Sequence, residues 1–242
     1  MTAISVFTVK GSPGATTLAL ALAAHAREHG AVLIEADAAG GDLALRFGIP
    51  QAPGLAQFAA RARQTGGRRE VLDGLVRTVG GDGVSPLVDL LPAPVEPGAV
   101  QAAVAALAAT PETLSAAGIT HPLVLDLGRL APQPPDFGLL AACDTAALVV
   151  RGDAVSLGHA REAGWLGELP VRCGFVLVDT GPYRAAEAAD VLGLPCLASV
   201  PFSRRPLRGH GAIKTLRGLW TVLTTPVAEP MPTPELVEVN GR

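Results

Sequence analysis

Lysine is nearly absent from this chain. Of its 242 residues 19 are basic, and all of these are arginine except Lys10 and Lys214. The two cations are not interchangeable, because the lysine ammonium is a compact point charge and the arginine guanidinium is a planar fork. One of the two lysines nevertheless stands in a glycine-rich stretch at residues 10–14. This placement indicates a position where an ammonium group is required.

Other features are missing as well. The net charge of −3 and the pI near 5.9 argue against a surface that binds nucleic acid over its whole extent. Cysteines occur only at 143, 173 and 196 and form no CxxC pair, so we expect buried, reduced thiols in a cytoplasmic protein. No apolar run reaches the roughly 18 residues of a transmembrane helix. Met1 leads directly into a strand pattern, so we also expect no signal peptide.

What is present predicts a large α/β domain. Hydrophobic residues make up 49% of the chain, enough for a sizeable core. Short β-branched runs alternate with Ala/Leu-rich stretches, which is typical of a doubly wound, mostly parallel sheet with helices on both faces. We expect this domain to span residues 1–225 and the Pro-rich, acidic residues 226–242 to form a disordered tail. The predicted strands are 3–9, 31–37, one within 84–94, 121–128, 145–151, 173–180 and 195–201, and the predicted helices include 16–29, 53–65, 70–79 and 97–109.

The stretch FTVKGSPGATTLALALAA, residues 7–24, joins the first strand to the first helix through a glycine-rich turn. Backbone N–H groups and the helix dipole meet an anion at such a turn. The P-loop pattern GxxxxGK[ST] is incomplete, because Val9 stands at its first glycine and Ala15 at its lysine. The loop by itself leaves two interpretations open, a phosphate-binding loop or a turn without a ligand.

Four motifs in order resemble those of the ParA/MinD family of deviant-Walker NTPases. The family loop reads KGGxGKT[ST], and KGSPGATT keeps its signature lysine as Lys10. VLIEADAAGGDLALRFG resembles the second strand of the family, and PLVLDLG resembles its Walker B strand. LVVRGDAVSL and GFVLVDT…LGLPCLASVPFSRR resemble its later strands and the loop near the base. The resemblance covers about residues 3–225 and implies the P-loop NTPase fold.

The resemblance also implies a site for ATP and Mg²⁺. Thr16 would ligate Mg²⁺, and Asp126 would hold it through water. Asp37 would orient the attacking water and contact the metal shell, and Gly128 matches the switch position. The residues implied in nucleotide binding are Gly11, Ser12, Pro13, Gly14, Ala15, Thr16, Thr17, Asp179, Pro201 and Phe202.

Each acidic residue has a simpler interpretation. Glu35 and Asp37 are also consistent with caps of a strand end, Asp126 with a strand-terminal acid, and Asp179 with an acid in the turn before TGPY. Asp179 also departs from the family, which has an Asn that reads adenine at this place.

The missing ammonium at Ala15 affects turnover more than binding. A lysine beside a γ-phosphate contributes several kcal/mol at an effective dielectric constant near 20, before desolvation is counted. It also neutralises charge in the transition state. In the family, the signature lysine reaches the nucleotide of the facing subunit. The resemblance therefore implies catalytic roles for Lys10 and Asp37, very slow or absent hydrolysis, and a homodimer that forms with nucleotide.

The segment 203–217 is basic, with Arg204, Arg205, Arg208, Lys214 and Arg217 and no acid. It is either the solvated edge of an ordinary C-terminal helix or a weak, non-specific contact with DNA phosphates. The acidic, Pro-rich end argues against a membrane-anchoring helix of the MinD type.

The leading hypothesis is a ParA/MinD-like positioning or assembly factor with a protein partner. Its nearest analogue is the TadZ/CpaE branch, which localises pilus or secretion machinery. Two alternatives stay open: a slow partition-type ATPase that cycles on DNA, and a scaffold that no longer binds nucleotide.

Overall fold

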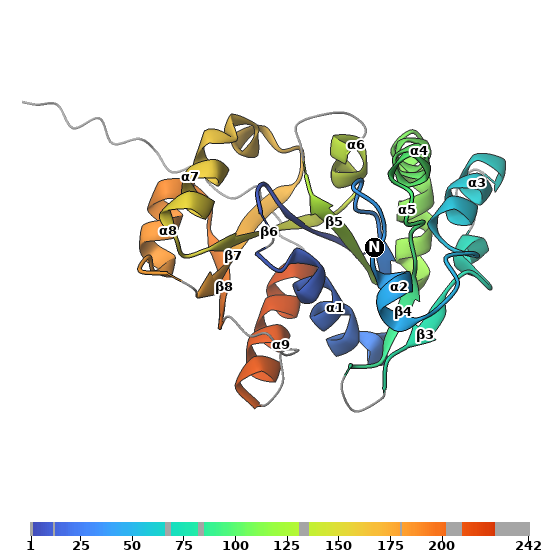
Figure 1. Ribbon diagram of the computed structural model, residues 1–242, viewed down its shortest axis with the longest axis horizontal. Coiled ribbons are helices and arrows are strands. Elements are labelled where there is room, and N and C mark those ends of the chain that lie inside the picture. The colour runs from blue at the N-terminus through green and yellow to red at the C-terminus, as the bar shows by residue number, and fades with distance from the viewer. Residues whose placement is uncertain are drawn as a thin grey trace, which may run out of the picture.

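The computed structural model describes residues 2–11, 13–65, 69–81, 85–130, 136–179, 181–201 and 210–225. Within these residues one eight-stranded sheet has the order β3-β4-β2-β5-β1-β6-β7-β8, with helices on both faces (Figure 1). All neighbouring strands are parallel except the edge pair β3–β4. The strands are β1 (Ala3–Thr8), β2 (Val32–Glu35), β3 (Arg77–Val79), β4 (Val88–Leu91), β5 (Leu123–Arg129), β6 (Thr145–Arg151), β7 (Arg172–Asp179) and β8 (Cys196–Pro201).

The helices follow the strands in alternation, as a doubly wound sheet requires. The fold class predicted from the sequence is confirmed. The α-helices are α1 (Ala15–His25), α2 (Leu43–Phe47), α3 (Leu55–Thr65), α4 (Pro97–Ala108), α5 (Pro111–Thr120), α6 (Asp136–Ala141), α7 (Ala154–Glu162), α8 (Ala185–Leu192) and α9 (His210–Thr224).

The central strands are apolar on both faces because helices cover both faces. In β1, Ile4 and Val6 pack toward one side and Ala3 and Phe7 toward the other, and all four are fully buried. On the side of Ile4 and Val6, α1 and α9 pack against each other and against the sheet (Figure 1). Helices α3 to α8 form the opposite layer. The two layers bury the first strand in the middle of the sheet, so its carboxyl end and the start of α1 lie at the centre of the molecule.

One predicted helix is wrong. Residues 70–79 form a 3-10 turn, Arg69–Leu72, followed by β3. Gly74 adopts a left-handed conformation with φ 70°, which interrupts any helix at this point. Beyond it, the side chain of Thr78 donates to Asp89 Oδ1 at 2.6 Å across the β3–β4 pair. Pairing with the sheet edge therefore overrides the local helical pattern.

No single helix in the described residues is long and apolar enough to cross a membrane. Helices α4 and α5 together have the length and composition of a span, but they meet at an angle of 84°. Both contribute side chains to the core of the domain.

A buried carboxylate joins the end of β2 to two other segments. Glu35 is only 2% exposed, and its Oε1 accepts hydrogen bonds from the backbone N–H groups of Asp42 at 2.6 Å and Leu43 at 2.8 Å. Its Oε2 accepts from the Ala93 N–H at 2.9 Å. The carboxylate thus caps α2 and ties it to the segment between β4 and α4. The cap interpretation of the sequence fits Glu35.

Replacement of Glu35 by Ala leaves three N–H groups without their acceptor. We expect Glu35→Ala to lower the free energy of unfolding by about 2–4 kcal/mol, because unsatisfied buried donors are costly. Urea denaturation followed by circular dichroism measures this. The control is Glu168→Ala at an exposed site, which should stay within about 0.5 kcal/mol of wild type. Equal stability of the two variants would contradict the role of Glu35.

Candidate functional site

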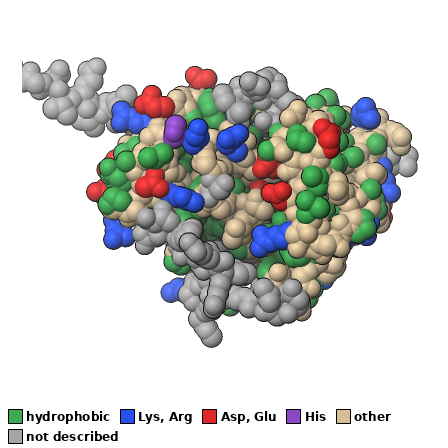
Figure 2. Space-filling model, viewed as in Figure 1, with side chains coloured by type: hydrophobic (Ala, Val, Ile, Leu, Met, Phe, Trp, Pro, Cys, Tyr) green, Lys and Arg blue, Asp and Glu red, His purple; other side chains and the backbone are tan. Residues whose placement is uncertain are grey.

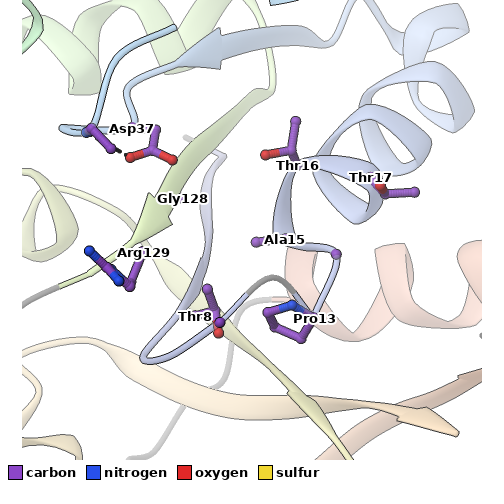
Figure 3. A pocket seen from close by; sticks show the side chains of 11 residues that line it. Thr8, Pro13, Ala15, Thr16, Thr17, Asp37, Gly128 and Arg129 are labelled. Atoms are coloured by element: carbon purple, nitrogen blue, oxygen red, sulfur yellow. Dashed lines mark hydrogen bonds between the residues drawn. The ribbon is translucent and has the colours of Figure 1, made fainter. Parts of the chain in front are cut away.

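A pocket of about 400 Å³ lies where β1, β2 and β5 end. Because these are parallel neighbours, their carboxyl ends meet at one edge of the sheet, where ligands bind in doubly wound folds. Figure 2 shows a hollow in this face of the molecule with acidic and basic side chains near it. The lining residues are Thr8, Gly11, Pro13, Gly14, Ala15, Thr16, Thr17, Asp37, Ala39, Gly128 and Arg129 (Figure 3).

The glycine-rich loop presents the start of α1 to this pocket. Gly11 and Gly14 have φ values of 72° and 108°, which residues with a Cβ adopt at a cost. Gly14 is the N-cap of α1, and no side chain caps the first turn, which also contains no acid. By contrast, Glu96 caps α4 and Asp153 caps α7. The first N–H groups of α1 are therefore available to an anion, and the helix dipole favours one there.

Thr16 and Asp126 connect α1 to β5 beneath the pocket. Asp126 is 1% exposed, its side chain hydrogen-bonds with that of Thr16, and its Oδ1 accepts from the Gly128 N–H at 3.1 Å. Burial, together with the smaller effect of the charges of Asp37 and Glu35, raises the pKa of Asp126 to about 7 against these two hydrogen bonds. Among the residues that the structure describes, no cation compensates this carboxylate.

Asp37 lies on the opposite wall from the helix start (Figure 3). Its Oδ1 accepts from the Ala39 N–H at 2.9 Å, and a side chain at Gly128 would overlap its carboxylate. Gly128 also has φ 57°, so this position excludes other residues by space and by conformation. Burial raises the pKa of Asp37, partly offset by the Ala39 hydrogen bond and the charge of Arg129.

Oxygen ligands suit Mg²⁺, and the Thr16 hydroxyl and the Asp126 carboxylate adjoin each other at this place. In the described residues no group of three or more His, Cys, Asp or Glu side chains is placed to hold a metal. A cation here would therefore need further oxygens from a ligand or from water.

Comparison with known proteins gives no match to a family model and no match among curated proteins. Solved structures do match. The cell division ATPase MinD of Pyrococcus furiosus is 20% identical with a TM-score of 0.69, over 90% of this chain and 96% of that one. MinD of Pyrococcus horikoshii, complexed with Mg-ADP, is 18% identical with a TM-score of 0.69, over 92% and 96%. A ParA family ATPase of Chlorobium tepidum is 18% identical with a TM-score of 0.66, over 91% of each chain.

This chain has the ParA/MinD fold. The resemblance found in the sequence motifs is thereby confirmed at the level of the fold, across about nine-tenths of the chain. The identities are too low to transfer ligands, so the site residues stay predictions about this chain.

Ala15, where the P-loop pattern has its lysine, and the signature lysine Lys10 differ in their surroundings. Ala15 is 5% exposed, and its methyl group points from α1 toward the pocket (Figure 3). Lys10 is exposed and does not line the pocket. The signature lysine therefore faces solvent in a single chain.

The residues expected near the base are described only in part. Asp179 ends β7 and pairs with Pro201 at the end of β8, two strands from the edge of the pocket. Pro201 is not among the described residues that line the pocket. Ser12, Phe202, Arg204, Arg205, Arg208 and the tail 226–242 lie outside the described residues.

Sequence reasoning missed three of the lining residues, Thr8, Ala39 and Arg129, and Arg129 is the charged one among them. In a regular strand, residues 126 and 129 face opposite sides of the sheet. Here Val6 pairs with Asp126 but Thr8 pairs with Arg129, so β5 uses three residues where β1 uses two. This β-bulge redirects the chain after Gly128. A glycine inside a strand pattern is the signal that predicts such a bulge.

The raised pKa of Asp126 predicts how the stability of the protein, without metal or nucleotide, changes with pH. Between its ordinary pKa of 3.8 and about 7, the unfolded state has lost the proton and the folded state keeps it, so stability falls as the pH rises. We expect Asp126→Asn to remove this pH dependence and to stabilise the protein at pH 8 by up to about 4 kcal/mol, because one pKa unit corresponds to about 1.4 kcal/mol.

Chemical denaturation of both proteins at pH 5 and pH 8 measures this difference. Asn retains an oxygen for the Gly128 N–H, so the comparison isolates the charge. Parallel pH profiles of wild type and variant would contradict the buried, uncompensated carboxylate.

Proposed function

We propose that this chain is a ParA/MinD-like positioning factor that binds ATP with Mg²⁺, hydrolyses it very slowly, and acts in the cytoplasm on a protein partner. The observation that carries the proposal is the pocket between the uncapped start of α1 and the carboxyl ends of β2 and β5. The P. horikoshii MinD of the same fold is a complex with Mg-ADP.

The chain's own groups suit a phosphate ligand with a cation. Gly11, Gly14 and Ala15 to Thr17 line the pocket, and their backbone N–H groups would hold phosphate oxygens. Thr16 and Asp126 would hold Mg²⁺, which neutralises phosphate charge when bound. Asp37, across the pocket, would orient water toward the phosphates (Figure 3).

Ala15 is the reason why we expect slow ATP hydrolysis. A lysine side chain at this position would enter the pocket, whereas the methyl group supplies no charge to the transition state. Binding draws on backbone groups that alanine does not change. The proposal is therefore a nucleotide-dependent switch whose bound state persists.

We expect wild type to bind Mg-ATP saturably in isothermal titration calorimetry, with a turnover far below the ordinary enzyme range of about 1 s⁻¹ or more. Ala15→Lys should raise affinity or turnover, because it restores an ammonium at the phosphates. Ala15→Met, of similar length without charge, is the matched control and should raise neither.

The absence of any Mg-ATP binding by wild type would overturn this proposal in favour of a scaffold. An ordinary turnover by wild type would also contradict it, because the remaining residues would then suffice for catalysis.

The exposure of Lys10 supports a homodimer that forms with nucleotide. Since this side chain does not line the pocket of its own chain, the family arrangement in which it meets the nucleotide of a facing subunit is available to it. Ligand bound only by the dimer shifts the equilibrium toward the dimer by mass action. We propose a two-fold homodimer with nucleotide at the interface. A protein cargo such as pilus or secretion machinery is the finer proposal, and it rests on the TadZ/CpaE resemblance alone.

We expect Mg-ATP to convert wild type from monomer to dimer in sedimentation velocity, and Lys10→Ala to abolish this response while leaving the apo monomer folded. Lys214→Ala removes the other lysine, whose side chain is exposed on α9, and this variant should dimerise like wild type. A wild type that remains monomeric when saturated with nucleotide would refute the dimer.

A further inference from the structure

The pocket carries an unusual balance of charge. Among its described lining residues, Arg129 is the one cationic side chain and Asp37 is the one acidic side chain. Asp126 adds a second carboxyl group behind Thr16. A triphosphate brings several further negative charges, which Mg²⁺ offsets only in part. A phosphate ligand in this pocket therefore needs a cation from the protein, and the loop offers none at Ala15.

The bulge in β5 places Arg129 at the pocket. Since Arg129 rather than Gly128 pairs with Thr8, it occupies the register position that an unbulged strand would give to residue 128. Thr8 and Arg129 both line the pocket. The Leu130 N–H donates to the Thr8 carbonyl at 2.8 Å and fixes the backbone directly after the arginine.

The side chain is available to a ligand. Arg129 is exposed at the end of β5, and none of the hydrogen bonds or ion pairs between described residues engages it. Figure 3 shows it beside Gly128 and Asp37, across the pocket from Ala15 and Thr16. Its charge acts on Asp37, where it opposes the effect of burial on the pKa of that carboxyl. The charge of Asp42 acts in the opposite sense and raises that pKa, and Asp37 also interacts with the buried Asp126.

We infer that Arg129 binds the phosphates of the nucleotide and replaces, from the β5 wall of the pocket, the cation that the loop lacks at Ala15. The inference rests on the proposed function and names a further binding residue of that site. A guanidinium suits the role because its planar fork pairs with two phosphate oxygens at once. Within one chain, the positive charge at the phosphates then comes from β5, the strand that carries Asp126, and not from the chain's own glycine-rich loop.

The test compares Mg-ATP affinity in wild type, Arg129→Ala, Arg129→Lys and Arg161→Ala. Arg161 is an exposed arginine on α7 and is not among the lining residues, so its removal controls for net charge. Loss of a charge-assisted hydrogen bond predicts about 10- to 100-fold weaker binding for Arg129→Ala. Arg129→Lys should fall between, since it keeps the charge and loses the fork. Arg161→Ala should stay within about twofold, because salt screens an exposed charge that makes no contact with the ligand.

A second arm tests replacement directly. In the Arg129→Ala background, Ala15→Lys should restore much of the lost affinity, and it should gain more there than in wild type. Such non-additivity is the signature of two groups that act on one ligand. Thermal melts of the apo proteins show that each variant is folded.

The outcomes separate the inference from the proposed function. Equal Mg-ATP affinity of wild type and Arg129→Ala would overturn the inference about Arg129 without contradicting the proposed function. Equal losses in Arg129→Ala and Arg161→Ala would overturn it too, because net charge alone would explain them. A folded wild type that binds no Mg-ATP would overturn the proposed function and the inference with it.

Discussion

The carboxyl group of Asp126 is the centre on which the site depends. It joins three parts of the molecule, because it bonds with Thr16 at the start of α1, accepts from the Gly128 N–H within the bulge, and lies on the strand between β1 and β2. Burial without a neighbouring cation is unfavourable for an ionised carboxylate. The fold tolerates this cost where a ligand can later compensate it, which is why perturbed acids mark candidate sites.

The surrounding elements are stabilised by means that leave the pocket free. Glu35, two residues before Asp37, accepts hydrogen bonds with both oxygens from backbone N–H groups of other segments. Helices α4 and α7 have carboxylate caps, whereas α1 has none and directs its first turn at the pocket. Adjacent acids thus have separate tasks: Glu35 holds the fold together, and Asp37 and Asp126 remain beside the open space.

Much of this arrangement follows from the sequence pattern. Alternating strand and helix patterns predicted the doubly wound sheet, and the strand–glycine loop–helix order predicted where an anion would meet the chain. The structure brings eight of the predicted residues to the pocket: Gly11, Pro13, Gly14, Ala15, Thr16, Thr17, Asp37 and Gly128. These residues lie together because local geometry sets the loop and because parallel strands end at one edge of the sheet. The helix predicted at 70–79 failed because edge pairing with β4 is not local.

The sequence by itself determined the fold class, the glycine loop and the absence of its lysine, since each is a property of consecutive residues. Only the tertiary structure decided which acid is structural and which faces the pocket, because Glu35 and Asp37 look alike in a strand-end pattern. It also decided the place of Arg129. A single extra residue in β5 changes the side of the sheet on which later residues lie, and that register exists only between paired strands.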